Sequence, residues 1–120
     1  MALFHGLPGV FLQEHVDTTL ETIKQTSAQM TEYGVTIYCK PDASTLTKED
    51  WSPGYMGSHG VHPAGVFMLA MLYIYRGQRE FGLDLAKRPM QEMARRGFTF
   101  DLPVIIDGEL HGEIAPRIGL

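Results

Sequence analysis

The chain has 120 residues, of which 44% are hydrophobic and 20% are charged, and its formal net charge is −4. This length allows at most one domain with a real hydrophobic core, so residues 1–120 are interpreted as a single α-helical module. A negative chain without clustered lysine and arginine gives no reason to expect a nucleic-acid partner, because phosphate binding needs such clusters.

The cysteine content and the apolar runs bear on where the protein works. Cys39 is the only cysteine, so no internal disulfide can form, and no basic and apolar signal segment precedes the first helix. Both features favour a cytoplasmic location. The longest apolar run, Val66–Tyr75, is too short to cross a bilayer, so no membrane span is expected.

An amphipathic helix is predicted over residues 13–32. Apolar residues recur there at spacings of three and four, which places them on one helix face. They include Leu12, Val16, Leu20, Ile23 and Met30. Gly34 is the expected C-terminal stop, and the helix should lie on the surface with one side buried.

A long segment without helical periodicity follows this helix. Val35–Cys39 is rich in β-prone residues, and Lys40–His62 holds repeated proline and glycine, which favours a loop. A loop of about 20 residues in a compact domain is usually functional or disordered. Trp51 and Tyr55 argue against disorder, because disordered segments are poor in aromatic residues.

A second helix is predicted over residues 64–76, after Pro63 and before Gly77. Its residues are apolar on every side, and such a helix must be buried on every side. One partner helix cannot provide that cover. The pattern therefore indicates a layered helical architecture that can extend beyond this chain.

A third, amphipathic helix is predicted over residues 78–96. Pro89 lies inside it and is expected to kink or restart it, because proline lacks the backbone N–H. Phe98–Ile106 is typical of an extended segment, and Asp107 and Gly108 suggest a hairpin-type turn. The fold class is therefore mainly α: helical hairpins with a long loop and a short C-terminal extended segment.

Two aromatic and two histidine side chains of the loop are candidate substrate-binding residues. The rings of Trp51 and Tyr55 suit stacking on the apolar face of a sugar, although they can equally seal the loop onto the core. His59 and His62 are three residues apart, but zinc needs three or four ligands and no HExxH or CxxC motif accompanies them. No metal is expected, and His62 should meet a ligand at the entrance of the second helix.

Asp101 completes the candidate site, because it lies between Phe100 and Leu102 and its carboxyl group could be partly buried. No catalytic residue can be assigned, since the sequence identifies no pair of carboxylates on opposite walls of a cleft. No GxGxxG, P-loop or GxSxG motif is present, and no cofactor is expected.

Several segments carry a family resemblance. They are Gln13–Lys24, Pro41–Ala43, Gly54–Tyr55, Phe67–Ala86 and Gly97–Pro103. In this order they resemble the catalytic region of glucosylceramidase-like glycoside hydrolases of the bile-acid β-glucosidase type (family 116 and its relatives). The resemblance concerns helix patterns. It implies an α/α toroid of paired helices, retaining hydrolysis of β-glucosides and a carbohydrate ligand.

Three predicted helices are too few to close a toroid, and Pro89 and the short tail after Gly112 depart from the family. The resemblance therefore implies a partial module, a fragment or subunit of a β-glucosidase-like hydrolase that is catalytically incomplete alone. Its partner would be the remainder of the toroidal domain or another protein. The alternative is a small helical protein-interaction module without catalysis. A third hypothesis is a small free-standing enzyme that uses Asp101 and His62.

Overall fold

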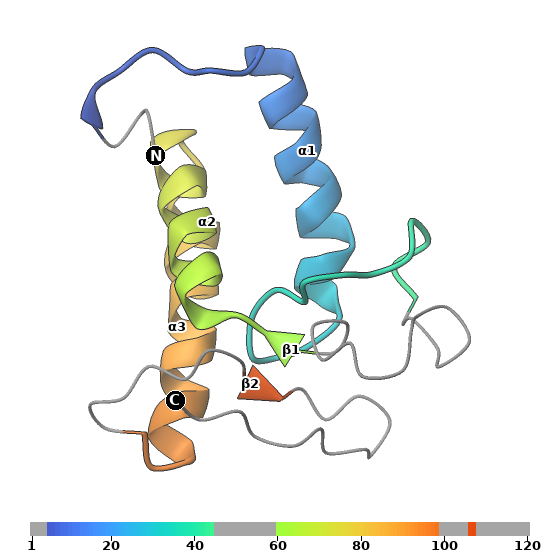
Figure 1. Cartoon of the computed structure of the whole chain (residues 1–120), viewed down its shortest axis with the longest axis vertical. Helices are drawn as coiled ribbons and strands as arrows, with labels where there is room; N and C mark the ends of the chain where they lie inside the picture. The colour runs from blue at the N-terminus through green and yellow to red at the C-terminus, as the bar shows by residue number, and fades with distance from the viewer. Residues whose placement is uncertain (1–4, 45–59, 99–105, 108–120) are drawn as a thin grey trace.

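The computed structural model describes residues 5–44, 60–98 and 106–107 (Figure 1). The elements, in chain order, are α1 (Gln13–Gln25), the short 3-10 helix η2 (Ser27–Gln29), β1 (Gly60–Val61), α2 (Pro63–Tyr75), α3 (Arg79–Arg95) and β2 (Ile106–Asp107). This part of the chain is mainly helical, which confirms the predicted fold class at that level. The toroidal arrangement stays a prediction.

Helices α2 and α3 form an antiparallel hairpin, and α1 stands beside it (Figure 1). The turn between them depends on Gly77, whose φ of 83° lies in the left-handed region that favours glycine. The N–H groups of Gly77 and Gln78 donate to the carbonyls of Ile74 and Tyr73, and this satisfies the last turn of α2. The predicted stop at Gly77 is confirmed.

The two hairpin helices approach each other most closely at Gly82 of α3. A Cβ atom at this position would lie 2.6 Å from the carbonyl oxygen of Ala70 and 2.8 Å from the side chain of Ile74. Both neighbours belong to α2, and the nearest is backbone, which cannot rotate away. Only glycine therefore permits this helix–helix distance.

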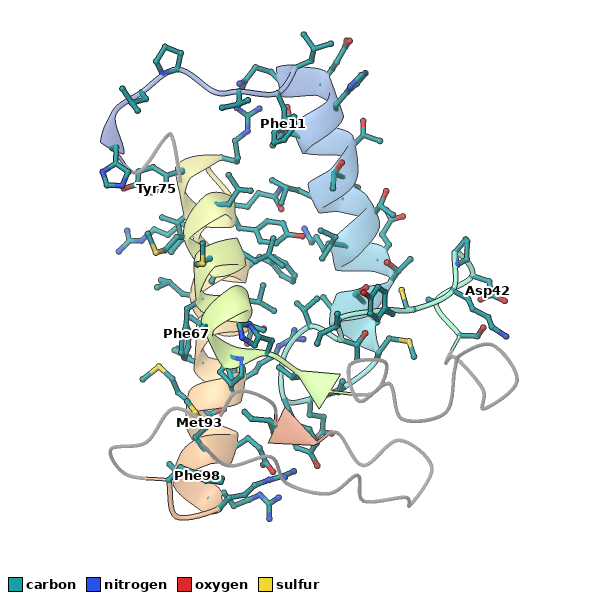
Figure 2. The ribbon with its side chains drawn as sticks, viewed as in Figure 1. Phe11, Asp42, Phe67, Tyr75, Met93 and Phe98 are labelled. Atoms are coloured by element: carbon teal, nitrogen blue, oxygen red, sulfur yellow. The ribbon has the colours of Figure 1, made fainter. Side chains whose placement is uncertain are left out.

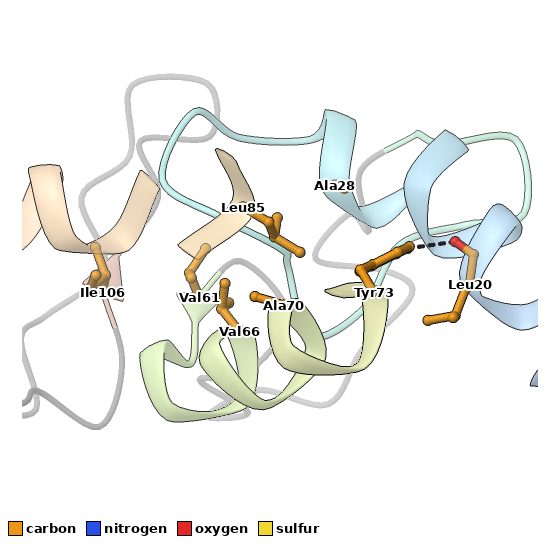
Figure 3. Close-up of a cluster of buried hydrophobic side chains, with 8 residues drawn as sticks. All are labelled: Leu20, Ala28, Val61, Val66, Ala70, Tyr73, Leu85 and Ile106. Atoms are coloured by element: carbon orange, nitrogen blue, oxygen red, sulfur yellow. Dashed lines mark hydrogen bonds between the residues drawn. The ribbon is translucent and has the colours of Figure 1, made fainter. Parts of the chain in front are cut away.

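The buried core lies between the hairpin, α1 and the short sheet (Figure 3). Its members are Leu20, Ala28, Val61, Val66, Ala70, Tyr73, Leu85 and Ile106. The Tyr73 hydroxyl donates a hydrogen bond of 2.5 Å to the carbonyl of Leu20, so the core also contains a polar tie from α2 to α1. Burial is the main reason that the pKa of Tyr73 rises to about 12.

Long polar side chains hold α1 to the hairpin as well. The Arg76 guanidinium donates from Nη2 to both carboxylate oxygens of Asp17, at 2.6 Å each. Lys24 Nζ donates to Gln78 Oε1 over 3.3 Å and lies 5.0 Å from the ring centroid of Phe81. These side chains reach across a space between α1 and the hairpin.

The first helix is shorter than predicted, because α1 ends at Gln25 rather than at residue 32. The Ser27 carbonyl accepts the N–H of Thr36 over 3.3 Å, and Ser27 Oγ lies 3.1 Å from Cys39 Sγ. These bonds to distant residues hold Ser27 outside α1, and the helix ends at Gln25. The apolar spacing continues past Gln25, which is why the sequence suggested a longer helix, and the expected stop at Gly34 lies beyond the real end.

The strand predictions need two corrections. Val35–Cys39 forms no strand, and only Thr36 makes an isolated antiparallel bridge, to Val61. Asp107 was expected in a turn but lies in β2, which pairs antiparallel with β1 so that Ile106 lies opposite Val61. Val61 thus pairs with Thr36 on one side and with Ile106 on the other. Its side chain is completely buried.

One prediction about the hairpin is also wrong. Helix α3 runs through Pro89 without restarting, because the proline ring is fully buried and packing compensates for the missing N–H. Helix α2 is only partly covered within the described structure, and cover by a larger helical architecture stays a prediction. Met68 and Tyr75 are exposed, whereas Val66 and Ala70 are buried.

Gly82→Ala tests the close approach in the hairpin. In an ordinary helix this change stabilises by up to about 1 kcal/mol through helix propensity. Here the new methyl group would meet the Ala70 carbonyl, so we expect a loss of about 2 kcal/mol in the free energy of unfolding. Urea denaturation followed by circular dichroism measures the difference. A stabilised variant would show that the helices do not meet at this distance.

Candidate functional site

Four of the five predicted site residues, Trp51, Tyr55, His59 and Asp101, lie outside the described residues. The fifth, His62, is the N-cap of α2, and its Nδ1 accepts the backbone N–H of Gly65 over 3.0 Å. The sequence placed His62 correctly at the helix entrance. It missed the capping role, because histidine is not among the usual N-cap residues.

This cap changes what the helix entrance can do. The first turn of a helix has backbone N–H groups without partners inside the helix, and these can donate to a ligand. His62 already occupies the Gly65 donor, and Pro63 has no N–H to offer. His62 in this conformation caps the helix through Nδ1, and its proposed contact with a ligand stays a prediction.

The most distinctive surface of the described structure is the side of the hairpin that faces away from α1. Figure 2 shows Phe67 and Tyr75 of α2 pointing to this side. Helical spacings of three and four place further residues beside them. We call this set the outer face: Phe67, Met68, Met71, Ile74 and Tyr75 from α2 and Leu83, Ala86, Met90 and Met93 from α3, of which Ala86 and Met93 are partly buried and also pack against the core.

Every residue of the outer face is apolar or aromatic, and several are well exposed. Met90 is 57% exposed and Tyr75 is 53% exposed, with Met68 and Leu83 also in the exposed class. Arg79 and Lys87 are exposed and lie four residues before and after Leu83, and Lys87 lies between Leu83 and Met90 on the same helix face. The outer face is thus an apolar strip that carries two basic side chains on its α3 part.

The ion pairs of the hairpin lie on its other side. Arg88 Nη2 contacts Asp84 at 2.8 Å, and Arg88 Nη1 donates to the carbonyl of Ala28, also at 2.8 Å. Arg76 reaches Asp17 of α1, as described above. The inner side of the hairpin therefore carries these ion pairs together with the apolar core that packs against α1 and η2, and the outer side is mainly apolar.

Glu92 is the one carboxylate in the described structure that is nearly fully buried, with 5% exposure. It accepts hydrogen bonds of 2.6 and 2.8 Å from Arg95 and a further bond from Arg96. The bonds from Arg95 hold the pKa of Glu92 below its usual value, Arg96 adds to this, and burial opposes it. An ionised, doubly paired carboxylate is unsuited to act as a general acid.

A cavity of about 360 Å³ lies between α1 and α2. Its lining is mostly apolar, and the polar side chains in it are those of His15 and Thr19. The full lining is Phe11, His15, Val16, Thr19, Leu20, Ile23, Leu69 and Leu72. An engineered protein cavity of about 150 Å³ binds benzene, so this space is large enough for an apolar group. The Thr19 hydroxyl already donates to the carbonyl of His15, which leaves the lining with little polar specificity.

Other kinds of site find no support in residues 5–44, 60–98 and 106–107. They contain no group of three or more histidine, cysteine, aspartate or glutamate residues that could hold a metal. None of the helices described has both the length and the apolar character needed to cross a bilayer. Comparisons with protein-family models, curated proteins and solved structures find no match to this chain.

The capping role of His62 can be tested by a pair of substitutions. His62→Ala removes the acceptor for the Gly65 N–H and should lower the free energy of unfolding by about 1 kcal/mol. His62→Asp supplies a carboxylate acceptor at the same N-cap and should keep or raise stability. Thermal denaturation of both variants checks this. Equal losses in the two variants would contradict the capping role.

The buried Glu92 predicts a specific pH dependence. Its pKa is lowered in the folded state, so its stabilising contribution is complete above the unfolded value of about 4.3 and is lost as the pH falls through the lower folded value. Glu92→Gln should cost about 2–3 kcal/mol at neutral pH and flatten the decline of stability below about pH 5. Denaturant titrations between neutral and acidic pH measure both effects.

A matched control for this prediction is Glu80→Gln, which removes an exposed carboxylate from the first turn of the same helix. It should leave most of the acid-dependent loss in place. An unchanged pH profile in Glu92→Gln would show that Glu92 does not carry this contribution.

Proposed function

We propose that this chain is a small helical interaction module whose outer face binds an apolar helical surface. The single observation that carries the proposal is the nine-residue outer face, in which several large apolar side chains are exposed beside the basic side chains of Arg79 and Lys87. Folded monomers rarely expose a contiguous apolar patch larger than a few hundred Å², and such patches mark interaction sites.

The chemistry of the outer face fits a helical partner. Four of its members are methionines: Met68, Met71, Met90 and Met93. Methionine is flexible and polarizable, and surfaces rich in it adapt to the ridges of a bound helix.

The hairpin offers this face in a preorganised form. Gly82 lets α2 and α3 pack tightly, and the Gly77 turn satisfies the end of α2. A rigid face loses little conformational freedom when a partner binds, so more of the contact free energy appears as affinity. The face is thus suited to binding without rearrangement of the hairpin.

The predicted role as part of a β-glucosidase-like hydrolase is a proposal about which partner binds the outer face. In a toroid of paired helices each hairpin packs against its neighbours, so the remainder of a toroidal domain would be one apolar helical surface of the right kind. The proposed sugar contacts, Trp51, Tyr55, His59 and Asp101, lie outside the described residues. The outer face supports the interaction function independently of any sugar.

A synthetic amphipathic helix with leucines along one face is a direct probe of the outer face. Titrated into isotope-labelled protein, it should shift the NMR signals of α2 and α3 residues on the outer face. Met90→Glu places a charge in the middle of the face at an exposed position, so it should weaken binding at least tenfold, about 1.4 kcal/mol, without unfolding the hairpin.

The matched control is Val10→Glu, which adds the same charge at a position that is 81% exposed and outside the outer face. Its affinity for the peptide should equal that of the unchanged protein. Peptide-induced shifts confined to α1, or equal affinities for Met90→Glu and Val10→Glu, would refute the proposal.

A further inference from the structure

We infer that the cavity between α1 and α2 binds a small neutral aromatic molecule of two fused rings that carries a single N–H or O–H donor, a class that indole represents. The volume of the cavity is about 360 Å³. Its lining shares no residue with the outer face, so this binding site goes beyond the proposed interaction function.

The cavity has a buried floor and an open mouth. Leu20, which is 1% exposed, closes its inner end, and the partly buried Val16, Leu69 and Leu72 stand on its walls. Phe11 also lines the cavity and is 75% exposed, so it marks the side that meets solvent. A small molecule can therefore enter from solvent and place most of its surface against side chains, as ligands do in concave apolar sites.

Polar bonds keep the two walls apart. The Tyr73 hydroxyl donates to the carbonyl of Leu20 over 2.5 Å, and Arg76 Nη2 lies 2.6 Å from both carboxylate oxygens of Asp17. These bonds fix α1 at a distance that the apolar side chains between the helices do not bridge. Because protein interiors are close-packed, facing apolar walls across an unfilled space lack contacts that a bound molecule would supply.

The volume of the cavity sets the size of the ligand. An engineered cavity of about 150 Å³ holds benzene. The cavity between α1 and α2 is somewhat more than twice as large, which matches two fused rings. Rigid rings also lose less conformational freedom on binding than a flexible chain of the same volume, and the ring of Phe11 can contact them edge to face.

The charges around the cavity favour a neutral ligand. None of the described residues that line it is a lysine, arginine, aspartate or glutamate. The two cationic side chains that connect α1 with the hairpin, Arg76 and Lys24, already bond to Asp17 and Gln78. A carboxylate in the cavity would therefore lose its hydration without gaining a cationic partner.

Thr19 gives the cavity one hydrogen-bond acceptor. Its hydroxyl hydrogen is donated to the carbonyl of His15 over 2.7 Å. A hydroxyl oxygen has two lone pairs, so it can accept a bond while it donates one. A single N–H or O–H of a ligand thus finds a partner on the wall, whereas further polar groups would be desolvated without one.

Titration of indole into protein with isotope-labelled methyl groups tests the site. The ring current of bound indole should shift the methyl signals of Leu20, Leu69 and Leu72, with a dissociation constant on the order of 100 µM. The methyl signals of Met68 and Met90 should stay in place, although both side chains are exposed on the outer face. An indole carboxylate, which adds a negative charge, should bind at least tenfold more weakly.

Two ligands and two variants measure the contribution of Thr19. N-methylindole keeps the rings but lacks the donor, so the unchanged protein should bind it about fivefold more weakly than indole. Thr19→Val keeps the shape of the side chain and removes the acceptor, so it should bind both ligands equally. The matched control is Thr18→Val, because the Thr18 hydroxyl makes the same kind of bond, to the carbonyl of Glu14 over 2.8 Å, without belonging to the described lining. It should keep the preference for indole.

A third variant fills the cavity. Val16→Phe places a ring in the space from the side of α1, where Val16 is partly buried. It should abolish the indole-induced shifts and keep or raise the melting temperature, because the new ring replaces the missing contacts. Circular dichroism checks that the variant keeps its helices.

Three results would overturn the inference. Cavity methyl signals that do not move at millimolar indole would show that the space is closed or already filled. Equal shifts of the Met68 and Met90 signals would show adsorption to any apolar surface. A preference for indole that survives in Thr19→Val would show that the donor meets no acceptor in this cavity. None of these results affects peptide binding to the outer face, so this inference and the proposed function fail separately.

Discussion

The contact between Gly82 and the backbone of Ala70 is the constraint on which the rest of this structure depends. It brings α2 and α3 so close that the two helices behave as one slab with two sides. An apolar helix that would otherwise need cover all round then divides its residues between those sides. One side receives α1 and the sheet, and no helix or strand of residues 5–44, 60–98 and 106–107 covers the other. The outer face is thus a direct result of how tightly the hairpin closes.

The attachment of α1 follows a different principle. No close glycine contact joins α1 to the hairpin in the described structure, and the connection is made by the buried Leu20 side chain, by long polar side chains and by one tyrosine hydroxyl. The Tyr73 bond to Leu20 and the Arg76 pair with Asp17 fix the position of α1 at a distance. The cavity between α1 and α2 is the space left by this arrangement. A closely packed hairpin and a loosely packed third helix therefore coexist in one small core.

The sequence predicted the features that depend on local chemistry. The glycine at position 77 ends α2, and His62 precedes the helix start as expected, because turn and cap signals act over a few residues. The sequence-based predictions were wrong where hydrogen bonds between residues far apart in the sequence decide the backbone conformation. Ser27 bonds to Thr36 and ends the first helix early, and Asp107 joins a strand instead of a turn. The apolar pattern of α2 predicted that one partner helix could not cover it, but composition alone cannot say which of its sides stays exposed. The residues proposed to meet a sugar remain a prediction, except His62.

The pairing of β1 with β2 has a consequence for how the chain folds. Strand β1 precedes the hairpin in the sequence and β2 follows it. Their pairing therefore closes a loop of the chain that contains α2 and α3. Contacts within the hairpin span few residues and cost little loop-closure entropy, whereas the strand pair closes a long loop. The hairpin should therefore form early and the strand pair late. During that interval both sides of the slab are uncovered, which makes newly synthesised chains most vulnerable to aggregation before α1 docks.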